Sequence, residues 1–344
     1  MRIADIRARL QAAGAQAPHA FRVLRLWSQA LPQDSGKRRI EHFLPASLLA
    51  ELQAITSELD ALARVVSVHP GEDGSERLLV GLRDGQMVES VLLPRDGLCI
   101  SSQVGCAVGC VFCMTGKGGL VRQLGSAEMV AQVVLARRRR PVKKVVFMGM
   151  GEPAHNLDDV LEAIDLLGTA GNVGHKNLVF STVGDPRVFE RLPRERVKPA
   201  LALSLHTTKP ALREQLLPRA PRLTPREIVE HGEAYARATG YPIQYQWTLI
   251  EGVNDGDDEL EGIVDLLKGR YGVLNMIPFN AVDGMDWKRP SWDRIRAIAG
   301  TLHRRGVLTK IRQSAGQDVD GGCGQLRARA ERSPRRVMIL SSRA

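Results

Sequence analysis

Beyond residue 100, the chain alternates short apolar runs with longer amphipathic segments. The apolar runs at 143–151, 177–184 and 198–207 are examples, and residues 157–171 and 224–240 are amphipathic. A short apolar run bounded by turn residues indicates a buried strand, and a 3.6-residue period indicates a helix. This alternation is typical of parallel βαβ units, of which about six fit before residue 320. We therefore predict an α/β fold: a partial barrel of the (β/α)6 type.

The residues before this alternation have a different pattern. The N-terminal part has a helical pattern and basic side chains, and LPASLLAELQAITSELDALARVV (44–66) is its clearest amphipathic segment. Next, ERLLVGL and MVESVLLP flank the turn Arg83-Asp84-Gly85, which predicts a β-hairpin. We expect four parts: a basic helical accessory domain that binds RNA (1–70), a hairpin and linker (71–98), the barrel core (99–326) and a basic C-terminal tail (327–344).

The charge of the chain favours a polyanionic partner. The formal net charge is +10 and the pI is about 9.7. Basic side chains gather at 137–140, followed by Lys143 and Lys144, and again at 327–336. Either run alone could be a solvated helix end or a frayed tail, but with the net charge they favour nucleic acid over a membrane surface. No run approaches the roughly 18 apolar residues of a membrane helix, and no secretory segment is evident. We expect a cytoplasmic monomer that binds no membrane.

Four of the five cysteines fall in residues 99–113, and the fifth is far away in sequence. So few cysteines in a cytosolic chain argue against a disulfide scaffold and favour metal binding or catalysis. Cys106, Cys110 and Cys113 form C-x3-C-x2-C, and three thiolates on a tight loop suit an iron–sulfur cluster with one iron left open. The alternatives are a zinc site, which would have to recruit Cys99 or Cys323, and ordinary buried cysteines.

Polar residues fall where several predicted strands end. In α/β barrels the site lies at the C-terminal ends of the strands. Gly151-Glu152, Ser181, Ser204–His206 and Asn280 all occupy such positions. They are candidate binding residues, although Ser204 and His206 could instead be hydrogen-bonded polar groups of the core.

The cysteine spacing, with Phe112 before the last cysteine, resembles the radical S-adenosylmethionine (SAM) superfamily. More narrowly, the chain resembles the RlmN/Cfr family of RNA adenine methyltransferases. Seven segments between about residue 88 and residue 326 support this: VESVLLP, LCISSQVGCAVGCVFCMTGKGG, VFMGMGEP, FSTVGDP, LALSLHT, NMIPFN and DVDGGCGQL. The most specific feature is Cys-Gly-Gln-Leu near the end, together with a cysteine seven residues before the cluster loop.

The resemblance implies a cofactor set and its ligands. A [4Fe-4S] cluster would be held by Cys106, Cys110 and Cys113, with SAM chelating the open iron. An external electron donor of the flavodoxin type and an RNA substrate, rRNA or tRNA, are also implied. The SAM contacts would come from the ends of strands: Gly151, Glu152, Ser181, Ser204, Leu205, His206 and Asn280.

The resemblance also implies a ping-pong reaction. The Cys323 thiolate takes a methyl group from one SAM. A radical derived from a second SAM removes hydrogen from that methyl group, and the resulting carbon radical adds to adenine, with C2 favoured over C8. Glu89 accepts the ring proton. Cys99 then attacks the sulfur of Cys323 and releases the product, leaving a transient disulfide. Without the resemblance, Glu89 would be interpreted as a solvated strand residue.

The sequence departs from the family pattern near the last cysteine. It has S-A-G-Q-D-V-D-G-G-C where the family has a pattern like R-G-D-D-I-D-A-A-C, and Phe279 replaces a common tryptophan. Ser181 lies in Ser-Thr-Val-Gly instead of Ser-Thr-Ser-Gly. These changes put the RNA target in doubt more than the reaction type. Two rival functions are a radical-SAM enzyme with a non-RNA substrate and a metal-stabilised RNA-binding protein without catalysis. Neither explains the paired Cys99 and Cys323.

Overall fold

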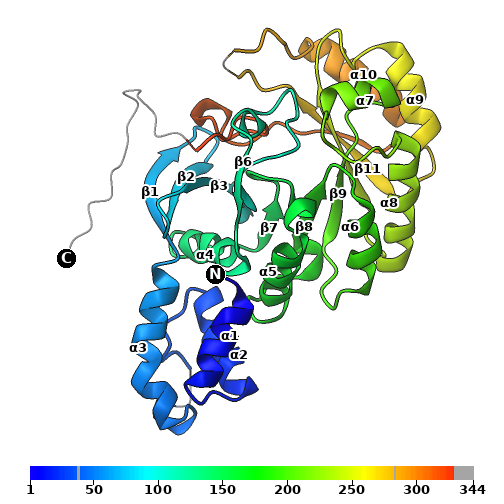
Figure 1. The fold of residues 1–344 in the computed structure, drawn as a ribbon. Coiled ribbons are helices and arrows are strands. Elements are labelled where there is room, and N and C mark those ends of the chain that lie inside the picture. Colours follow the sequence, from blue (N-terminus) through cyan, green and yellow to red (C-terminus); the bar gives the residue numbers. More distant parts are fainter. Residues whose placement is uncertain (37–38, 283, 329–344) are drawn as a thin grey trace.

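The computed structural model describes residues 1–36, 39–282 and 284–328 (Figure 1). Its main element is one mixed sheet in the order β1-β2-β3-β4-β7-β8-β9-β10-β11-β12. The strands are Ala63–Pro70 (β1), Glu76–Leu82 (β2), Met87–Leu93 (β3), Gly97–Cys99 (β4), Lys144–Phe147 (β7), Leu178–Thr182 (β8), Ala200–Ser204 (β9), Ile243–Leu249 (β10), Gly272–Pro278 (β11) and Thr309–Ile311 (β12). A separate two-stranded ribbon pairs β5 (Gln103–Gly105) with β6 (Leu120–Gln123).

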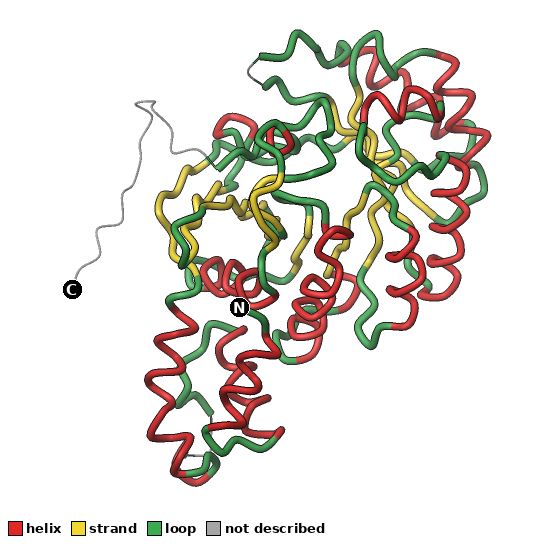
Figure 2. Tube along the Cα trace, in the orientation of Figure 1, coloured by secondary structure: helices red, strands yellow, loops and turns green. Residues whose placement is uncertain are grey.

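The strands from β4 to β12 are parallel, and β1 to β3 extend the sheet as an antiparallel meander. Within the described residues, β1 and β12 form the two free ends, so the barrel stays open. Figure 2 shows the curved sheet with helices outside it. The helices that follow the parallel strands are α4 (Ser126–Arg137), α5 (Leu157–Thr169), α6 (Pro186–Arg191), α7 (Pro210–Leu216), α8 (Pro225–Thr239), α9 (Asp257–Leu267) and α10 (Trp292–Arg304). The predicted α/β partial barrel is confirmed.

Local sequence signals account for several element boundaries. The Thr224 hydroxyl accepts a hydrogen bond from the Glu227 amide (3.2 Å), and the Glu227 carboxylate accepts one from the Thr224 amide (2.7 Å). This capping box starts α8 at Pro225, within the predicted helical segment 224–240. The predicted hairpin is β2 and β3, and Gly85 adopts a positive φ of 85° in its turn.

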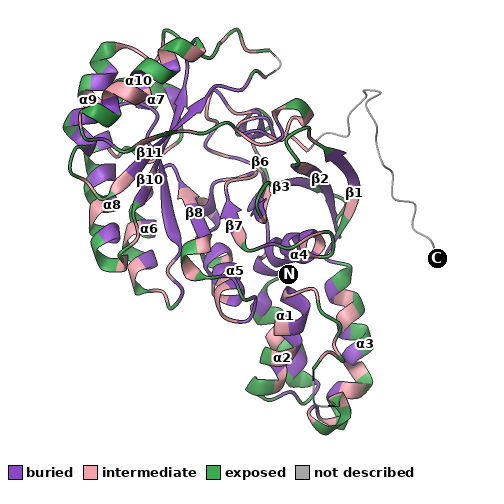
Figure 3. Ribbon diagram, turned by 180° about the vertical axis from the view of Figure 1, so that it is seen from behind, coloured by how far each residue is buried: buried purple, intermediate pink, exposed green. Residues whose placement is uncertain are grey.

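The N-terminal helices form a group beside the sheet (Figures 1 and 3). They are α1 (Ile3–Ala12), α2 (Ala17–Ser28) and α3 (Ala46–Asp60). The helical interpretation of residues 61–70 is wrong, because α3 ends at Asp60 and β1 begins at Ala63. The valine-rich sequence of β1 pairs with β2 along its length, so sheet pairing prevails over the helical periodicity continued from α3.

The basic run 137–140 bonds to other parts of the chain. Its first arginine donates to the carbonyl of Ser28 at the end of α2 (2.6 Å). Its second pairs with Asp60 at the end of α3 (2.6 Å), and its third pairs with Glu76 at the start of β2 (2.7 Å). The run therefore joins the N-terminal helices and the hairpin to the core.

Most of the predicted basic tail, residues 329–344, lies outside the described residues. Among the residues that the structure does describe, no helix has both the length and the apolar character needed to cross a membrane.

Candidate active site

The cysteine loop follows β5 and is held by backbone hydrogen bonds. Cys106 donates from its amide to the carbonyl of Gly119 (3.0 Å), and Val111 donates to the carbonyl of Leu216 (3.1 Å). Gly105 adopts a φ of 76°, and a Cβ there would lie 2.0 Å from the Gly119 carbonyl oxygen. Glycine is therefore required at the point where the loop begins.

The three loop cysteines share one apolar surrounding, packed with Val183 and Phe279. Burial raises the pKa of Cys106 to about 11 and also raises the pKa of Cys110 and Cys113. Repulsion between their thiolates contributes to the raised pKa of Cys106 and Cys110, so the thiols lie within electrostatic reach of one another. In residues 1–36, 39–282 and 284–328, no three His, Cys, Asp or Glu side chains are arranged to hold a single metal ion.

Gly151 and Glu152 follow β7 beside this loop. Gly151 has a φ of 108°, and a Cβ there would lie 2.7 Å from the side chain of Gln103. The Glu152 carboxylate accepts from the amides of Ala154 and Val183 (both 3.0 Å). Burial raises the pKa of Glu152 to about 7 in spite of these hydrogen bonds. The glutamate is thus fixed across the ends of β7 and β8.

Ser181 and Ser204 lie at the ends of β8 and β9, and both are half-buried. Leu205 is fully buried, and its amide donates to the carbonyl of Gln246 (3.0 Å). These residues end neighbouring parallel strands, so they occupy the same edge of the sheet as Glu152.

His206 is buried with a φ of 63°, an uncommon value for a residue other than glycine. Its Nδ1 accepts from the Thr248 amide (3.0 Å), and its ring meets Phe112 of the cysteine loop edge-on, with centroids 4.8 Å apart. Burial and the charge of Arg213 lower the pKa of His206 to about 3, so the ring is neutral with its proton on Nε2.

The segment around Cys323 lies on the cysteine loop. The Asn280 side-chain amide donates to the carbonyl of Cys323 (2.9 Å) and to Ser314 Oγ (3.0 Å). The Met114 amide donates to the carbonyl of Gly324 (2.7 Å). The Met114 contact holds the Cys323 segment on the cysteine loop, although more than two hundred residues separate the two in sequence. Cys323 itself is exposed.

Cys99 ends β4, close to Cys323. Burial raises the pKa of Cys99 to about 12, and the charge of Cys323 contributes in the same direction. Cys323 also contributes to the raised pKa of Cys113. All five cysteines are free thiols in this structure. The Cys323 thiol is therefore near both the cysteine loop and Cys99.

Glu89 lies on β3 and is only 1% exposed, so its interpretation as a solvated strand residue is wrong. One carboxylate oxygen accepts from the guanidinium of Arg77 on β2, which is 2% exposed. The other accepts from the backbone amides of Arg327 (2.8 Å) and Ala328 (3.1 Å). Arg77 also donates through Nε to the carbonyl of Val319 (2.5 Å). The buried pair therefore holds the segment that contains Cys323 at both ends.

Sequence reasoning missed Arg213, which is 3% exposed on α7. Its guanidinium donates to the carbonyls of Val183 and Ser204, and its Nε has no hydrogen-bond partner among the described residues. Burial lowers the pKa of Arg213 to about 10, while Cys110 and Glu152 oppose that shift. The sequence gives no signal for Arg213. It lies in the short helix α7, outside the predicted motif at the end of the preceding strand. Arg77 had only a weak signal, because it follows Glu76 at the start of an otherwise apolar strand.

Comparisons with known proteins agree with this arrangement. Residues 100–267 match the family model of the radical SAM superfamily. The chain is 70% identical to a probable RNA methyltransferase of Methylibium petroleiphilum over 98% of this chain and 96% of the relative. It is 69% identical to a probable RNA methyltransferase of Leptothrix cholodnii, with 98% of each chain covered.

One solved structure is similar over nearly the full length. It is a radical SAM methyltransferase from Sphaerobacter thermophilus, with a TM-score of 0.83 and 35% identity over 96% of this chain and 98% of that one. The matched cysteine loop, the full-length relatives and the shared fold all agree with the resemblance seen in the sequence. The chain belongs to the radical SAM superfamily and, within it, to the RlmN/Cfr family.

Proposed function

We propose that this protein methylates a ring carbon of adenine in RNA, C2 in preference to C8, through an S-methylated Cys323. The substrate class is rRNA or tRNA. One observation is the main support: Cys323 lies near both the cysteine loop and Cys99, in a segment that Asn280 holds by its backbone. The RNA methyltransferase names of the full-length relatives support the substrate class.

The residues fit the cofactors that the family uses. Cys106, Cys110 and Cys113 would hold a [4Fe-4S] cluster in their apolar surrounding, and buried Arg213 beside Cys110 would offset the negative charge of the thiolates. SAM would contact the strand-end residues Gly151, Glu152, Ser181, Ser204, Leu205, His206 and Asn280. When bound, the cluster and SAM supply a transferable methyl group and a 5′-deoxyadenosyl radical.

Cys323 acts first as a nucleophile. Its thiolate forms a bond to the methyl carbon as the sulfonium–methyl bond of SAM breaks, and S-adenosylhomocysteine leaves. The thiol is exposed, so it can reach a bound SAM and lose its proton to solvent. The methyl group is then held where Asn280 bonds to the carbonyl of Cys323 and Met114 bonds to the carbonyl of Gly324.

Glu89 would accept the proton from the adenine ring carbon, and the radical adduct formed by addition to the ring would pass its unpaired electron to the external electron-donor system. In this structure its carboxylate is covered by the amides of Arg327 and Ala328. A base must reach the proton that it removes, to within hydrogen-bond distance. We therefore expect residues 327–328 to move away from Glu89 when RNA enters, while Arg77 keeps the carboxylate oriented.

Cys99 would release the product from Cys323. Its thiolate forms the disulfide bond as the Cys323 sulfur–carbon bond breaks, and the product carbon keeps the electron pair and takes a proton. Two electrons and two protons from an external reductant then restore both thiols. We also infer a flavodoxin-type electron donor, a monomer and a cytoplasmic location, all of which remain predictions.

The test is methyl transfer from SAM labelled with a CD3 group. Anaerobically reconstituted protein is incubated with total RNA from a strain that lacks this gene, and the nucleosides are analysed by liquid chromatography and mass spectrometry. We expect a C-methyladenosine with two deuterium atoms, because one is removed with the radical step. Three deuterium atoms would refute the S-methylcysteine route. SAM cleavage without methylated nucleoside would favour a non-RNA substrate, and no SAM cleavage would favour the RNA-binding alternative.

A further inference from the structure

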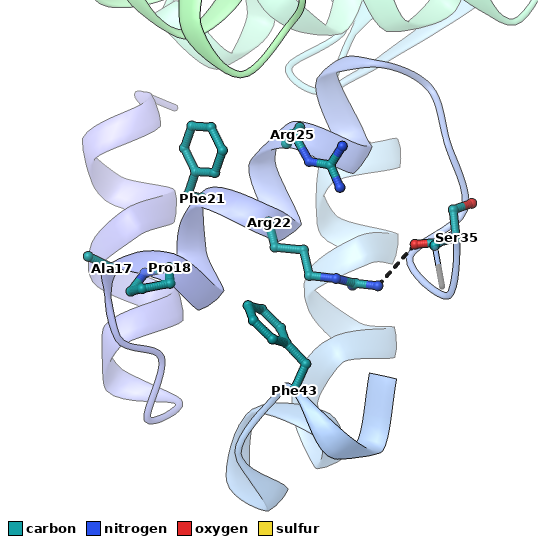
Figure 4. A pocket seen from close by; sticks show the side chains of 8 residues that line it. Ala17, Pro18, Phe21, Arg22, Arg25, Ser35 and Phe43 are labelled. Carbon is teal, nitrogen blue, oxygen red and sulfur yellow. Dashed lines mark hydrogen bonds between the residues drawn. The ribbon is translucent and has the colours of Figure 1, made fainter. Parts of the chain in front are cut away.

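A pocket of about 670 Å³ lies on the N-terminal helices, outside the proposed active site (Figure 4). Phe21, Arg22 and Arg25 of α2 line it together with Phe43, which precedes α3. We call this the α2 pocket. It opens to solvent, and none of the functions proposed so far uses it.

The ring of Phe21 in the α2 pocket is available for contact with a ligand. Phe21 is 49% exposed, although neighbouring α2 residues such as Val23 and Leu24 are buried in the core. Phe43 lies across the pocket from Phe21 in Figure 4. A single exposed ring is common on protein surfaces, but Phe21 lies in the same pocket as two arginines, where its face is open to a ligand.

Two arginines give the same pocket a fixed positive charge. The Arg22 guanidinium donates to the carbonyls of Gln33 (2.8 Å) and Ser35 (3.1 Å), and it lies over the ring of Phe43, 5.7 Å from the centroid. Burial and the nearby charge of Arg25 lower the pKa of Arg22, and Asp34 offsets part of this effect. Within the described part of the chain, the Arg25 side chain forms no ion pair. The two guanidinium groups therefore give the pocket a positive charge that suits an anionic group of a ligand.

An exposed ring next to fixed guanidinium groups is suited to a nucleotide. An unpaired base stacks on an aromatic ring, and a phosphate oxygen bonds to arginine. An acidic peptide could satisfy the arginines but not the rings. Residues 1–60 contain eight Lys or Arg and six Asp or Glu, so overall charge alone gives this unit little affinity for RNA. Local recognition at the pocket is required.

We propose that the α2 pocket binds one unpaired nucleotide of the RNA substrate, with its base against Phe21 and its phosphate at Arg22 and Arg25. This proposal rests on the proposed function, because the ligand is part of the same RNA. The nucleotide is not the methylated adenine, because the cysteine loop lies on the barrel and the pocket lies on the N-terminal helices (Figure 1). The N-terminal helices would then select RNA in which an unpaired nucleotide lies at a fixed distance from the target.

The test is binding of a fluorescein-labelled, unstructured single-stranded RNA to the full chain, measured by anisotropy. Loss of one base stack weakens binding by about 5- to 150-fold, which we expect for Phe21→Ala. The matched control is Leu31→Ala, which removes another exposed apolar side chain from the same unit. For charge, Arg25→Gln should lower the slope of log affinity against log salt by about one, and Arg7→Gln on α1 is the control.

Equal affinities of Phe21→Ala and Leu31→Ala would overturn the proposal, provided that both variants unfold at the wild-type temperature. An equal loss of affinity for a blunt RNA duplex would also overturn it, because paired bases cannot enter the pocket. Methylation of Cys323 by SAM needs no RNA, so it should be unchanged in all four variants. If the wild-type protein does not methylate Cys323, the proposed function fails; if it does and the pocket variants bind RNA normally, only the pocket proposal fails.

Discussion

The buried pair of Arg77 and Glu89 should stabilise the fold and hold the Cys323 segment at the same time. Both side chains are almost fully buried, and both bond to the backbone between residues 319 and 328. Removing one partner of a buried pair leaves an uncompensated charge, which costs about 3–5 kcal/mol. That is a large share of the roughly 5–15 kcal/mol that separates folded from unfolded domains. Arg77→Met and Glu89→Gln should each lower the free energy of unfolding by this amount.

The double variant separates pairing from general damage. Once Arg77 is replaced by Met, Glu89→Gln removes a charge that has lost its partner, so it should cost less than in the wild type. We expect the loss in the double variant to be smaller than the sum of the single losses by about 0.5–3 kcal/mol. Urea unfolding of the cluster-free protein, followed by circular dichroism, measures all four free energies. Additive losses would refute the pairing argument.

The same variants test the control of the Cys323 segment. Arg77→Met removes the Nε–H that bonds to Val319, so hydrogen exchange at residues 319–328 should become faster. Exchange in the distant helix α8 should not change, and it serves as the internal control. Unchanged exchange at 319–328 in a folded Arg77→Met protein would contradict the role of this pair in holding the segment.

Three further predictions concern single residues of the proposed active site. Gly151→Ala should cost about 1–3 kcal/mol in urea unfolding, because alanine is strained at this φ and its Cβ would clash with Gln103; wild-type stability would refute the requirement for glycine. The pKa of His206 is lowered from 6.5 to about 3 in the folded protein, so the free energy of unfolding should fall as the pH falls from 6.5 to 3. His206→Asn should reduce this loss by up to about 1.4 kcal/mol per pH unit. Equal pH profiles of the variant and the wild type would contradict a neutral buried ring. Arg213→Gln should lose its iron–sulfur absorbance faster than wild type in chelator, and equal rates would exclude charge compensation by this arginine.

The regular part of the fold could be predicted because its signals are local. The capping box at Thr224 and the turn at Gly85 each set a boundary within a few residues. The end of α3 could not be predicted in the same way, because the apolar period of residues 44–66 continues past Asp60. Only pairing with β2, whose residues lie 6 to 19 positions further along the chain, converts residues 63–70 into a strand.

The site shows the same division between local and distant information. The cysteine motif and the strand-end polar residues were visible in sequence, and the structure brings Cys99 and Cys323 together. The burial of Glu89 could not be predicted, because two of its partners, Arg327 and Ala328, come from a segment more than two hundred residues away. The bonds of the basic run 137–140 to other parts of the chain could not be predicted either, because composition gives its charge but not the carbonyls and carboxylates that it meets.

The central claim is that Cys323 holds the methyl group and then the substrate. Its most direct test is mass spectrometry of anaerobic Cys99→Ala protein, loaded with iron and incubated with SAM, reductant and RNA. Without the resolving thiol, we predict a Cys323 peptide covalently joined to an adenine nucleotide, and wild-type protein treated in parallel should show no such adduct. An unmodified Cys323 in iron-loaded, SAM-exposed protein would contradict the claim.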